Sequence, residues 1–298
     1  MNSVTVKAYA KINLGLDVIR KRPDGYHDVR MIMQTIGLHD TITIKKTNFQ
    51  SVTIRSNLYY LPTDRRNLVY KAVELFCINY PIRNGLNIYI SKRIPVAAGL
   101  AGGSADAAAT LIGLNKLFQT DLSLEELMHL GVRLGADVPF CLLMGTALSE
   151  GIGEILSPLA PMPECSILLV KPDVSVSTKH VYENLSLDEE IWHPNITAML
   201  DALKKNNIYS LAPLMDNILE SITIKEHPII GEIKEKMKDM EALTALMSGS
   251  GPTVFGIFDN QHKAEKAYRF FKSSGYGKQI VLTKPYYPET ISKSIRET

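Results

Sequence analysis

Cysteine is scarce in this sequence, which contains only Cys77, Cys141 and Cys165 among 298 residues. The three are odd in number, lie far apart and stand in apolar stretches. These features argue against a disulfide framework and against a cysteine-based metal site. We therefore expect free, buried thiols that pack as small apolar side chains.

An excess of charge of either sign is also absent. The 33 Lys and Arg residues nearly balance the 31 Asp and Glu residues, so the formal net charge is +2. Non-specific binding to nucleic acid or to an anionic membrane depends on a strong positive field. We therefore expect no nucleic acid and no membrane as a partner, and any phosphate must be bound at a local site.

Targeting and membrane-spanning patterns are missing as well. Residues 1–7 contain no basic region followed by an apolar core, as a secretory signal or transit peptide would. The longest small and apolar stretch, residues 95–114, is interrupted by glycines, a serine and an aspartate. These interruptions argue against a membrane span. We expect a cytoplasmic protein of bacterial type.

The sequence does contain enough apolar side chains for two cores, because they make up 45% of it. In the first half, alternating and β-branched runs predict strands, and helical spacing of apolar residues predicts helices. The predicted strands are 4–6, 12–19, 29–33, 41–44, 51–54 and 85–94, and the predicted helices are 67–79, one from 104 onward and 123–134. Pro23–Gly25 predicts a hairpin turn.

The second half predicts the order strand, helix, strand, strand, helix, strand, once shorter inserted helices are set aside. The strands are 166–171, 242–247, 253–258 and 279–283, and the helices are 228–240 and 263–271. This order is typical of a ferredoxin-like sandwich. Prolines cluster in residues 157–163, so we expect two domains, 1–160 and 161–298.

The strongest local signal is the glycine-rich segment 95–109, between a predicted strand and a predicted helix. Unpaired N–H groups and the positive end of a helix dipole would face an anion there. Glycines would let the backbone approach a phosphate closely. The segment matches neither the Walker A nor the dinucleotide-binding pattern. The alternative is an ordinary strand-to-helix turn with Ser104 as the helix cap.

A second glycine turn, Ser248–Pro252, lies between two predicted strands. It is either a plain hairpin loop or an anion-binding nest that completes a site begun elsewhere. Its residues are compatible with both interpretations.

Lys11 and Asp137 are charged residues in apolar surroundings. Lys11 is either a solvated side chain on a strand or a buried cation. Asp137 is either a turn residue after a helix or a buried general base paired with a lysine. Phosphoryl transfer to an alcohol needs such groups, because the hydroxyl proton must be accepted and the transferred charge neutralised.

Three segments together resemble the motifs of the GHMP kinase superfamily, in the same order: residues 10–14 with Asp24–His27, the glycine loop, and Ser248–Pro252. Their Ala-Lys-Ile-Asn-Leu and Arg-x-Asp-Gly-Tyr-His sequences, with Ile-Gly-Leu-His-Asp at 36–40, are similar to the family of 4-diphosphocytidyl-2-C-methyl-D-erythritol kinases. The resemblance implies a two-domain GHMP kinase fold of mixed α+β and α/β class. Its N-terminal, ATP-binding domain is ribosomal protein S5-like, and its C-terminal, substrate-binding domain is ferredoxin-like.

The resemblance also implies an activity. ATP would phosphorylate the 2-hydroxyl of 4-diphosphocytidyl-2-C-methyl-D-erythritol, a small-molecule substrate of non-mevalonate isoprenoid synthesis, giving the 2-phosphate and ADP. Mg2+ is implied, with no ligand assigned, and we expect a monomer or weak homodimer. Two alternatives stay open: a GHMP kinase for another small alcohol, and a non-catalytic nucleotide- or RNA-binding relative.

Site residues follow from the same resemblance. Asp137 would accept the proton of the substrate hydroxyl, and Lys11 would keep Asp137 ionised and orient the hydroxyl. The residues implied for ATP are Pro95, Ala97, Ala98, Gly99, Leu100, Ala101, Gly102, Gly103, Ser104, Asn67, Leu68 and Lys92; those implied for the substrate are Asn13, Tyr26, His27, Thr178, Tyr182, Gly249 and Ser250. Tyr182 is expected to face Tyr26 across the cytosine, with His27 at the edge of the base. Some family members carry extra glycines where this loop has Ala97 and Ala98.

Overall fold

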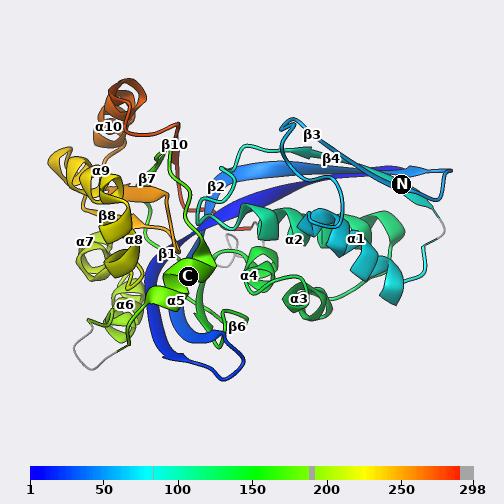
Figure 1. Cartoon of the computed structure of the whole chain (residues 1–298), viewed down its shortest axis with the longest axis horizontal. Coiled ribbons are helices and arrows are strands. Elements are labelled where there is room, and N and C mark those ends of the chain that lie inside the picture. Colours follow the sequence, from blue (N-terminus) through cyan, green and yellow to red (C-terminus); the bar gives the residue numbers. More distant parts are fainter. Residues whose placement is uncertain (83, 188–191, 289–298) are drawn as a thin grey trace. The chain divides into compact units, whose positions relative to one another are not determined.

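The computed structural model describes residues 1–82, 84–187 and 192–288, which form two compact units (Figure 1). The first unit contains residues 1–10, 38–96 and 101–143. The second contains residues 11–37, 97–100 and the described chain from residue 144 onward. The division into an ATP-binding and a substrate-binding domain at residue 160 stays a prediction.

Two long strands, β1 (Ser3–Lys21) and β2 (His27–Thr47), pair with each other and contribute residues to both units. The shorter strands predicted within these ranges were wrong in length. Several residues between them, such as Ala10, Gly37 and Asp40, have weak β-propensity, and pairing with the neighbouring strand overrides it. The predicted turn is confirmed, with Gly25 at φ +87° and the Asp24 carboxylate accepting a hydrogen bond from the Tyr26 N–H.

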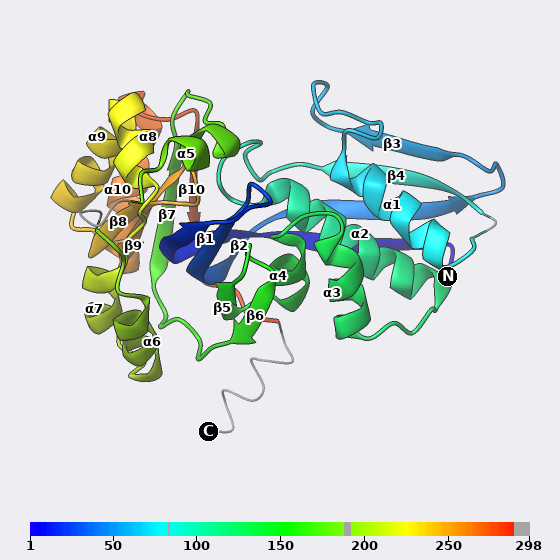
Figure 2. The ribbon, with the colours of Figure 1, turned by 60° about the horizontal axis from the view of Figure 1, so that its bottom comes forward.

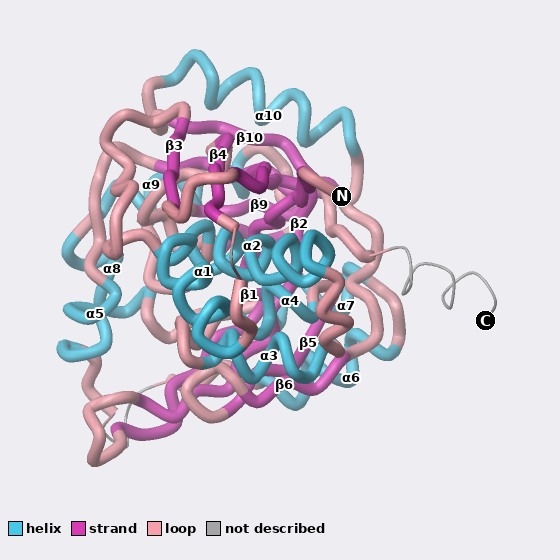
Figure 3. The backbone as a smooth tube through the Cα atoms, turned by 90° about the vertical axis from the view of Figure 1, so that its right-hand side faces the viewer, coloured by secondary structure: helices cyan, strands magenta, loops and turns pink. Residues whose placement is uncertain are grey.

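In the first unit, β4 (Gly85–Ser91) lies between β3 (Val52–Ser56), which is parallel to it, and Thr41–Thr47 of β2, which is antiparallel. Four helices belong to this unit: α1 (Leu68–Asn79), α2 (Gly102–Phe118), α3 (Leu124–Val132) and α4 (Val138–Leu143). Figure 3 shows α1 and α2 side by side. A Cβ atom on Gly113 would lie 2.8 Å from Ile44 Cδ1, so α2 packs closely on β2.

Polar side chains cap the starts of two of these helices. Asn67 accepts a hydrogen bond from the Val69 N–H at the start of α1, and Ser123 and Glu126 form a capping box at α3. At α2 the N-cap is Ala101, with no side-chain cap. The alternative in which Ser104 caps this helix is therefore wrong, because Ser104 already lies within its first turn.

In the second unit, β5 (Thr146–Glu150) lies between Met31–Gln34 of β2 and β6 (Ile155–Pro158), antiparallel to both. A separate sheet of four antiparallel strands has the order β10, β7, β9, β8. The bounds of these strands are Ser166–Lys171 for β7, Thr244–Met247 for β8, Val254–Phe258 for β9 and Gln279–Thr283 for β10.

Two helices, α9 (Pro228–Asp239) and α10 (Gln261–Ser274), pack against this four-stranded sheet (Figure 2). The predicted ferredoxin-like order is thus confirmed. The inserted helical segments between β7 and α9 are α5 (Thr178–Asn184), α6 (Ile196–Lys204), α7 (Ile208–Leu211), a 3-10 turn (Ala212–Leu214) and α8 (Glu220–Glu226).

The scarce cysteines are free, as expected. Cys141 and Cys165 are buried, whereas Cys77 is only half-buried, because it lies on α1 between buried Phe76 and exposed Ile78. Burial raises the pKa of the Cys165 thiol to about 12, which makes it a poor nucleophile. Within the described ranges, no helix combines the length and apolar character needed to span a bilayer.

The packing of α2 generates a stability prediction. Leu111 of α2 is fully buried, so Leu111→Ala should lower the free energy of unfolding by about 2–5 kcal/mol. Ile78 of α1 is 76% exposed, so Ile78→Ala should change the free energy of unfolding by less than about 0.5 kcal/mol. Urea unfolding of both variants measures the difference, and equal losses would contradict the packing described for α2.

Candidate active site

The glycine loop between β4 and α2 has left-handed backbone at alternate positions. The φ angles are +50° at Ala97, +75° at Gly99 and +54° at Ala101. Alternation of right- and left-handed residues is typical of backbone nests that bind anions. Two alanines therefore adopt a conformation that glycine adopts more easily. The methyl groups thus do not prevent the left-handed turn on which the predicted phosphate loop depends.

The first turn of α2 adds further N–H groups to the end of this loop. Because Ala101 provides no side-chain cap, the first N–H groups of the helix are not satisfied by such a cap. These groups and the helix dipole favour an anion at this end. The predicted order of strand, glycine turn and helix start is thus present, although the strand ends at Ser91 and the helix begins at Gly102.

Lys11 is a buried cation on β1, 4% exposed. Its ammonium donates hydrogen bonds to Asn13 Oδ1 at 2.7 Å and to the Gly99 carbonyl at 3.2 Å. The alternative of a solvated lysine is therefore wrong. The contact brings three predicted site residues of the second unit together, and it places a positive charge against the glycine loop.

The second glycine turn lies against the same part of the loop. The Ser248 hydroxyl donates to the Gly99 carbonyl at 2.9 Å. A Cβ atom on Gly99 would lie only 2.0 Å from the Ser248 carbonyl oxygen. Gly249 and Gly251 have φ angles of +58° and +90°. The turn does join two antiparallel strands, but it also packs on the loop, so it is more than a plain hairpin connection.

Asn217 is a buried residue that sequence reasoning missed. Its amide nitrogen donates to the carbonyls of Met247 and Gly249, both at 2.8 Å, and its Oδ1 accepts from the Leu219 N–H at 3.0 Å. This side chain therefore bonds the carbonyls of the two residues on either side of Ser248. The sequence offers no signal for it, because it falls between short helical segments.

Asp137 lies directly before α4 and is half-buried. Its carbonyl accepts a hydrogen bond from the Cys141 N–H at 3.1 Å, so the residue also starts the helix. Asp137 belongs to the first unit and Lys11 to the second. The functional pairing of the two side chains stays a prediction.

Asn67 and Leu68, predicted near the adenine, lie at the start of α1. The Asn67 side chain already makes two hydrogen bonds within the protein. Its amide donates to the Pro62 carbonyl at 2.7 Å, and its oxygen accepts from the Val69 N–H and so caps the helix. A Cβ atom on Gly103 would lie 3.6 Å from Leu68 Cδ1. The start of α1 and the start of α2 are therefore neighbours, as a shared nucleotide site requires.

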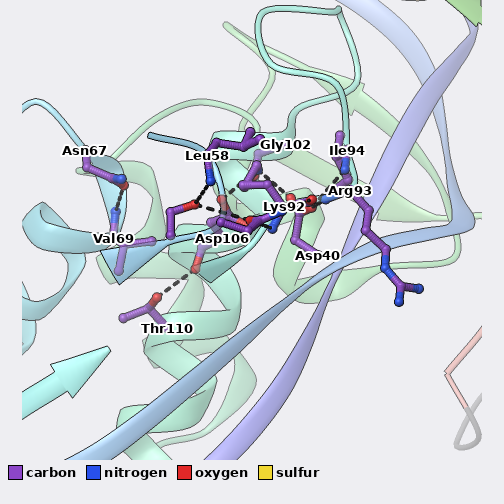
Figure 4. Close-up of polar contacts among 12 residues, drawn as sticks. Asp40, Leu58, Asn67, Val69, Lys92, Arg93, Ile94, Gly102, Asp106 and Thr110 are labelled. Carbon is purple, nitrogen blue, oxygen red and sulfur yellow. Dashed lines mark hydrogen bonds and ion pairs between the residues drawn. The ribbon is translucent and has the colours of Figure 1, made fainter. Parts of the chain in front are cut away.

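Lys92 forms a buried ionic cluster with two residues that the sequence reasoning did not single out as site residues, Asp40 and Asp106 (Figure 4). Its ammonium bonds both carboxylates, with 2.8 Å to Asp106 Oδ2. Burial alone would lower the pKa of Lys92, but the two carboxylates outweigh it and raise the pKa. The only sequence signal was a carboxylate beside or within an apolar predicted element: Asp40 directly precedes the predicted strand 41–44, and Asp106 lies in the helix predicted from 104 onward.

The predicted substrate residues of the second unit form two contacts. The His27 and Tyr182 rings lie 5.2 Å apart, tilted by 44°, and the hydroxyls of Thr178 and Ser250 lie 2.8 Å apart. Thr178 and Tyr182 share a face of α5, because they are four residues apart. Tyr26 is 60% exposed, and its stacking opposite Tyr182 stays a prediction.

His27 is nearly buried, and this environment disfavours its charged form. Burial, and secondarily the charge of Lys21, lowers the pKa of His27. The ring is therefore neutral at neutral pH and can both donate and accept a hydrogen bond. This is the form that the edge of a cytosine base would require.

Metal ligands are not preassembled in the described part of the chain, where no group of three or more His, Cys, Asp or Glu side chains could hold an ion. The six histidines other than His27 thus form no metal centre with these residue types within those ranges. Mg2+ seldom needs such a cage, because it keeps water ligands and uses substrate phosphates.

Family comparisons cover both halves of the chain. The model described as "GHMP kinases N terminal domain" matches residues 67–145, which include the glycine loop and Asp137. The model described as "GHMP kinases C terminal" matches residues 199–277, which include Asn217 and the second glycine turn. Each of the two glycine segments thus lies inside a matched region.

Several proteins that are similar to almost the whole chain carry the same name. The chain is 61% identical to the 4-diphosphocytidyl-2-C-methyl-D-erythritol kinase of Lachnoclostridium phytofermentans, over 95% of this chain and 98% of that one. It is 48% identical to the protein of the same name from Lachnospira eligens, over 97% and 100%. A crystal structure of 4-(cytidine 5'-diphospho)-2C-methyl-D-erythritol kinase matches with a TM-score of 0.80 and 31% identity, covering 95% of this chain and 100% of that one.

The contact between Gly99 and Ser248 generates a matched pair of stability predictions. Gly99→Ala should cost at least about 2 kcal/mol, because it combines a left-handed backbone with a clash against backbone. Gly103→Ala should be neutral or stabilise by up to about 1 kcal/mol, because Gly103 is helical and its added Cβ meets only ordinary contacts. Denaturant unfolding gives both values; a harmless Gly99→Ala would disprove the close approach.

Proposed function

The chain belongs to the GHMP kinase superfamily and, within it, to the family of 4-diphosphocytidyl-2-C-methyl-D-erythritol kinases, and we propose that the residues described above carry out its phosphoryl transfer. The protein is a small-molecule kinase: ATP phosphorylates the 2-hydroxyl of that substrate, giving the 2-phosphate and ADP. A non-catalytic relative is thereby excluded. The observation that best supports our assignment of the site is the buried ammonium of Lys11 against the Gly99 carbonyl.

Phosphate binding in this proposal rests on backbone rather than on clustered cations. The loop from Pro95 to Ser104 supplies left-handed turns and the uncapped start of α2. Its N–H groups would hold the phosphates of ATP, and they need no reorganisation during the reaction. This arrangement suits a protein whose net charge is only +2.

Lys11 and Asp137 would act on the substrate hydroxyl. We propose that Asp137 accepts the proton as the hydroxyl oxygen attacks the γ-phosphorus, and that the bond to the β-phosphate oxygen breaks to release ADP. Lys11 is held in place by Asn13 and Gly99. From that position its charge would keep Asp137 ionised and orient the hydroxyl.

Mg2+ fits the oxygen donors beside the loop. When bound, it would neutralise charge on the phosphates. The half-buried Ser104 hydroxyl in the first turn of α2 is the protein oxygen next to the N–H groups proposed to bind phosphate. We propose Ser104 as its protein ligand, with phosphates and water completing the coordination.

The substrate would lie on the pairs His27–Tyr182 and Thr178–Ser250. Tyr182 offers an aromatic face, neutral His27 offers hydrogen-bonding nitrogens, and exposed Tyr26 is free to cover the other face of the cytosine. Asn13 and Gly249 would contact the erythritol side. We further propose a cytoplasmic enzyme, because ATP is its co-substrate, and one that acts as a monomer or weak homodimer.

The proposed base is tested by Asp137→Asn. With ATP, Mg2+ and 4-diphosphocytidyl-2-C-methyl-D-erythritol, the wild type should produce a new phosphomonoester resonance in 31P NMR. The variant should lose about 10²–10⁴-fold in kcat, because no group accepts the proton, while the KM for ATP changes little. Asp201→Asn, at an exposed site on α6, is the control and should match the wild type. Normal turnover in Asp137→Asn would remove this residue from the mechanism.

The lowered pKa of His27 predicts a pH dependence of substrate binding. Burial keeps the pKa of His27 below the ordinary value of 6.5, so the neutral ring is lost only as the pH falls through that lowered pKa. The KM for the cytidine substrate should therefore stay constant at pH 6.5 and above, and rise as the pH falls through the lowered pKa. His27→Gln should have a higher KM that no longer changes with pH. An unchanged pH profile in His27→Gln would show that His27 does not bind the base.

A further inference from the structure

The buried cluster of Asp40, Lys92 and Asp106 joins three elements of the first unit (Figure 4). Asp40 lies on β2, Lys92 directly follows β4, and Asp106 lies near the start of α2. All three are nearly inaccessible, with 0%, 7% and 3% of their surfaces exposed. Burial of three charged groups is costly unless they satisfy one another, so the cluster needs a structural or functional reason.

The cluster bonds the chain on both sides of the glycine loop. On the near side, Asp40 Oδ1 accepts hydrogen bonds from the N–H groups of Arg93 and Ile94, with 2.8 Å to Ile94, immediately before Pro95. On the far side, the Lys92 ammonium contacts the Gly102 carbonyl at 3.5 Å and the Asp106 carboxylate at 2.8 Å. The start and the end of the loop are therefore held by the same three side chains.

Lys92 itself has little freedom to bind anything else. Its ammonium has three donors, and Asp40, Asp106 and Gly102 accept all three. Its backbone is held as well, because Asn57 Oδ1 accepts from the Lys92 N–H at 2.7 Å and the Asn57 amide donates to the Lys92 carbonyl at 3.1 Å. A lysine engaged in this way is poorly suited to bind phosphate directly.

We propose that Asp40 and Asp106, acting through Lys92, are positioning residues that clamp the two ends of the ATP loop and so set the affinity for ATP. This inference rests on the proposed function of residues 95–104. It changes the role expected for Lys92, from a direct contact with the nucleotide to one partner in the clamp. Backbone N–H groups bind a phosphate well only if they are held in the binding geometry beforehand.

The first test is Asp40→Asn, which replaces one acceptor oxygen by a donor group and so breaks the clamp. Its KM for ATP should rise at least about tenfold, with kcat and the KM for the cytidine substrate changed less than twofold. Asp64→Asn, the same substitution at an exposed residue of this unit, should behave as wild type. A fall in kcat alone, in proportion to the unfolded fraction seen by circular dichroism, would indicate a merely structural role and overturn the proposal.

The second test does not depend on the folding of Asp40→Asn. Asp106→Asn removes the carboxylate that the Lys92 ammonium bonds on the far side of the loop, so it too should raise the KM for ATP at least about tenfold, with kcat changed less than twofold. A KM for ATP equal to that of wild type in Asp106→Asn would overturn the proposal. An inactive wild type would instead refute the proposed function, so the two failures are distinguishable.

Discussion

The carbonyl group of Gly99 is the point on which the candidate site depends. It accepts hydrogen bonds from the Lys11 ammonium and from the Ser248 hydroxyl. Backbone approaches backbone there so closely that any side chain on Gly99 would collide with the Ser248 carbonyl. Three segments far apart in the sequence, near residues 11, 99 and 248, are thereby forced into one place. Their functional residues can act together only because a glycine stands at this position.

The same contact explains why buried polar groups surround the second glycine turn. A turn packed tightly against a loop cannot expose its own carbonyls to water, so it needs internal partners. Asn217 bonds the carbonyls on both sides of Ser248, and Glu220 accepts from the Met247 N–H at 2.7 Å while pairing with Lys234. Burial raises the pKa of Glu220, and the Lys234 charge opposes it. The second glycine turn is thus held in place by buried side chains.

Local patterns allowed much of the fold to be predicted from the sequence. The element order of the second unit and the helices predicted at 67–79 and 123–134 all depend on patterns of residues close together in the chain. The predictions failed where distant pairing decides the outcome. Strands β1 and β2 continue through several residues of weak β-propensity because they pair with each other, and β2 also pairs with β4 and β5.

The site shows the same division between local and distant causes. The glycine motifs and Lys11 could be singled out because their residue types are unusual where they stand. Asn217 and Asp40 could not, because an asparagine between short helical segments or an aspartate next to a predicted strand has many ordinary explanations. Their importance comes from partners 30 and 53 residues away, at Met247 and Arg93. A single sequence reveals the groups that could do chemistry more readily than the buried groups that hold them in place, since the latter are defined by contacts that only the fold creates.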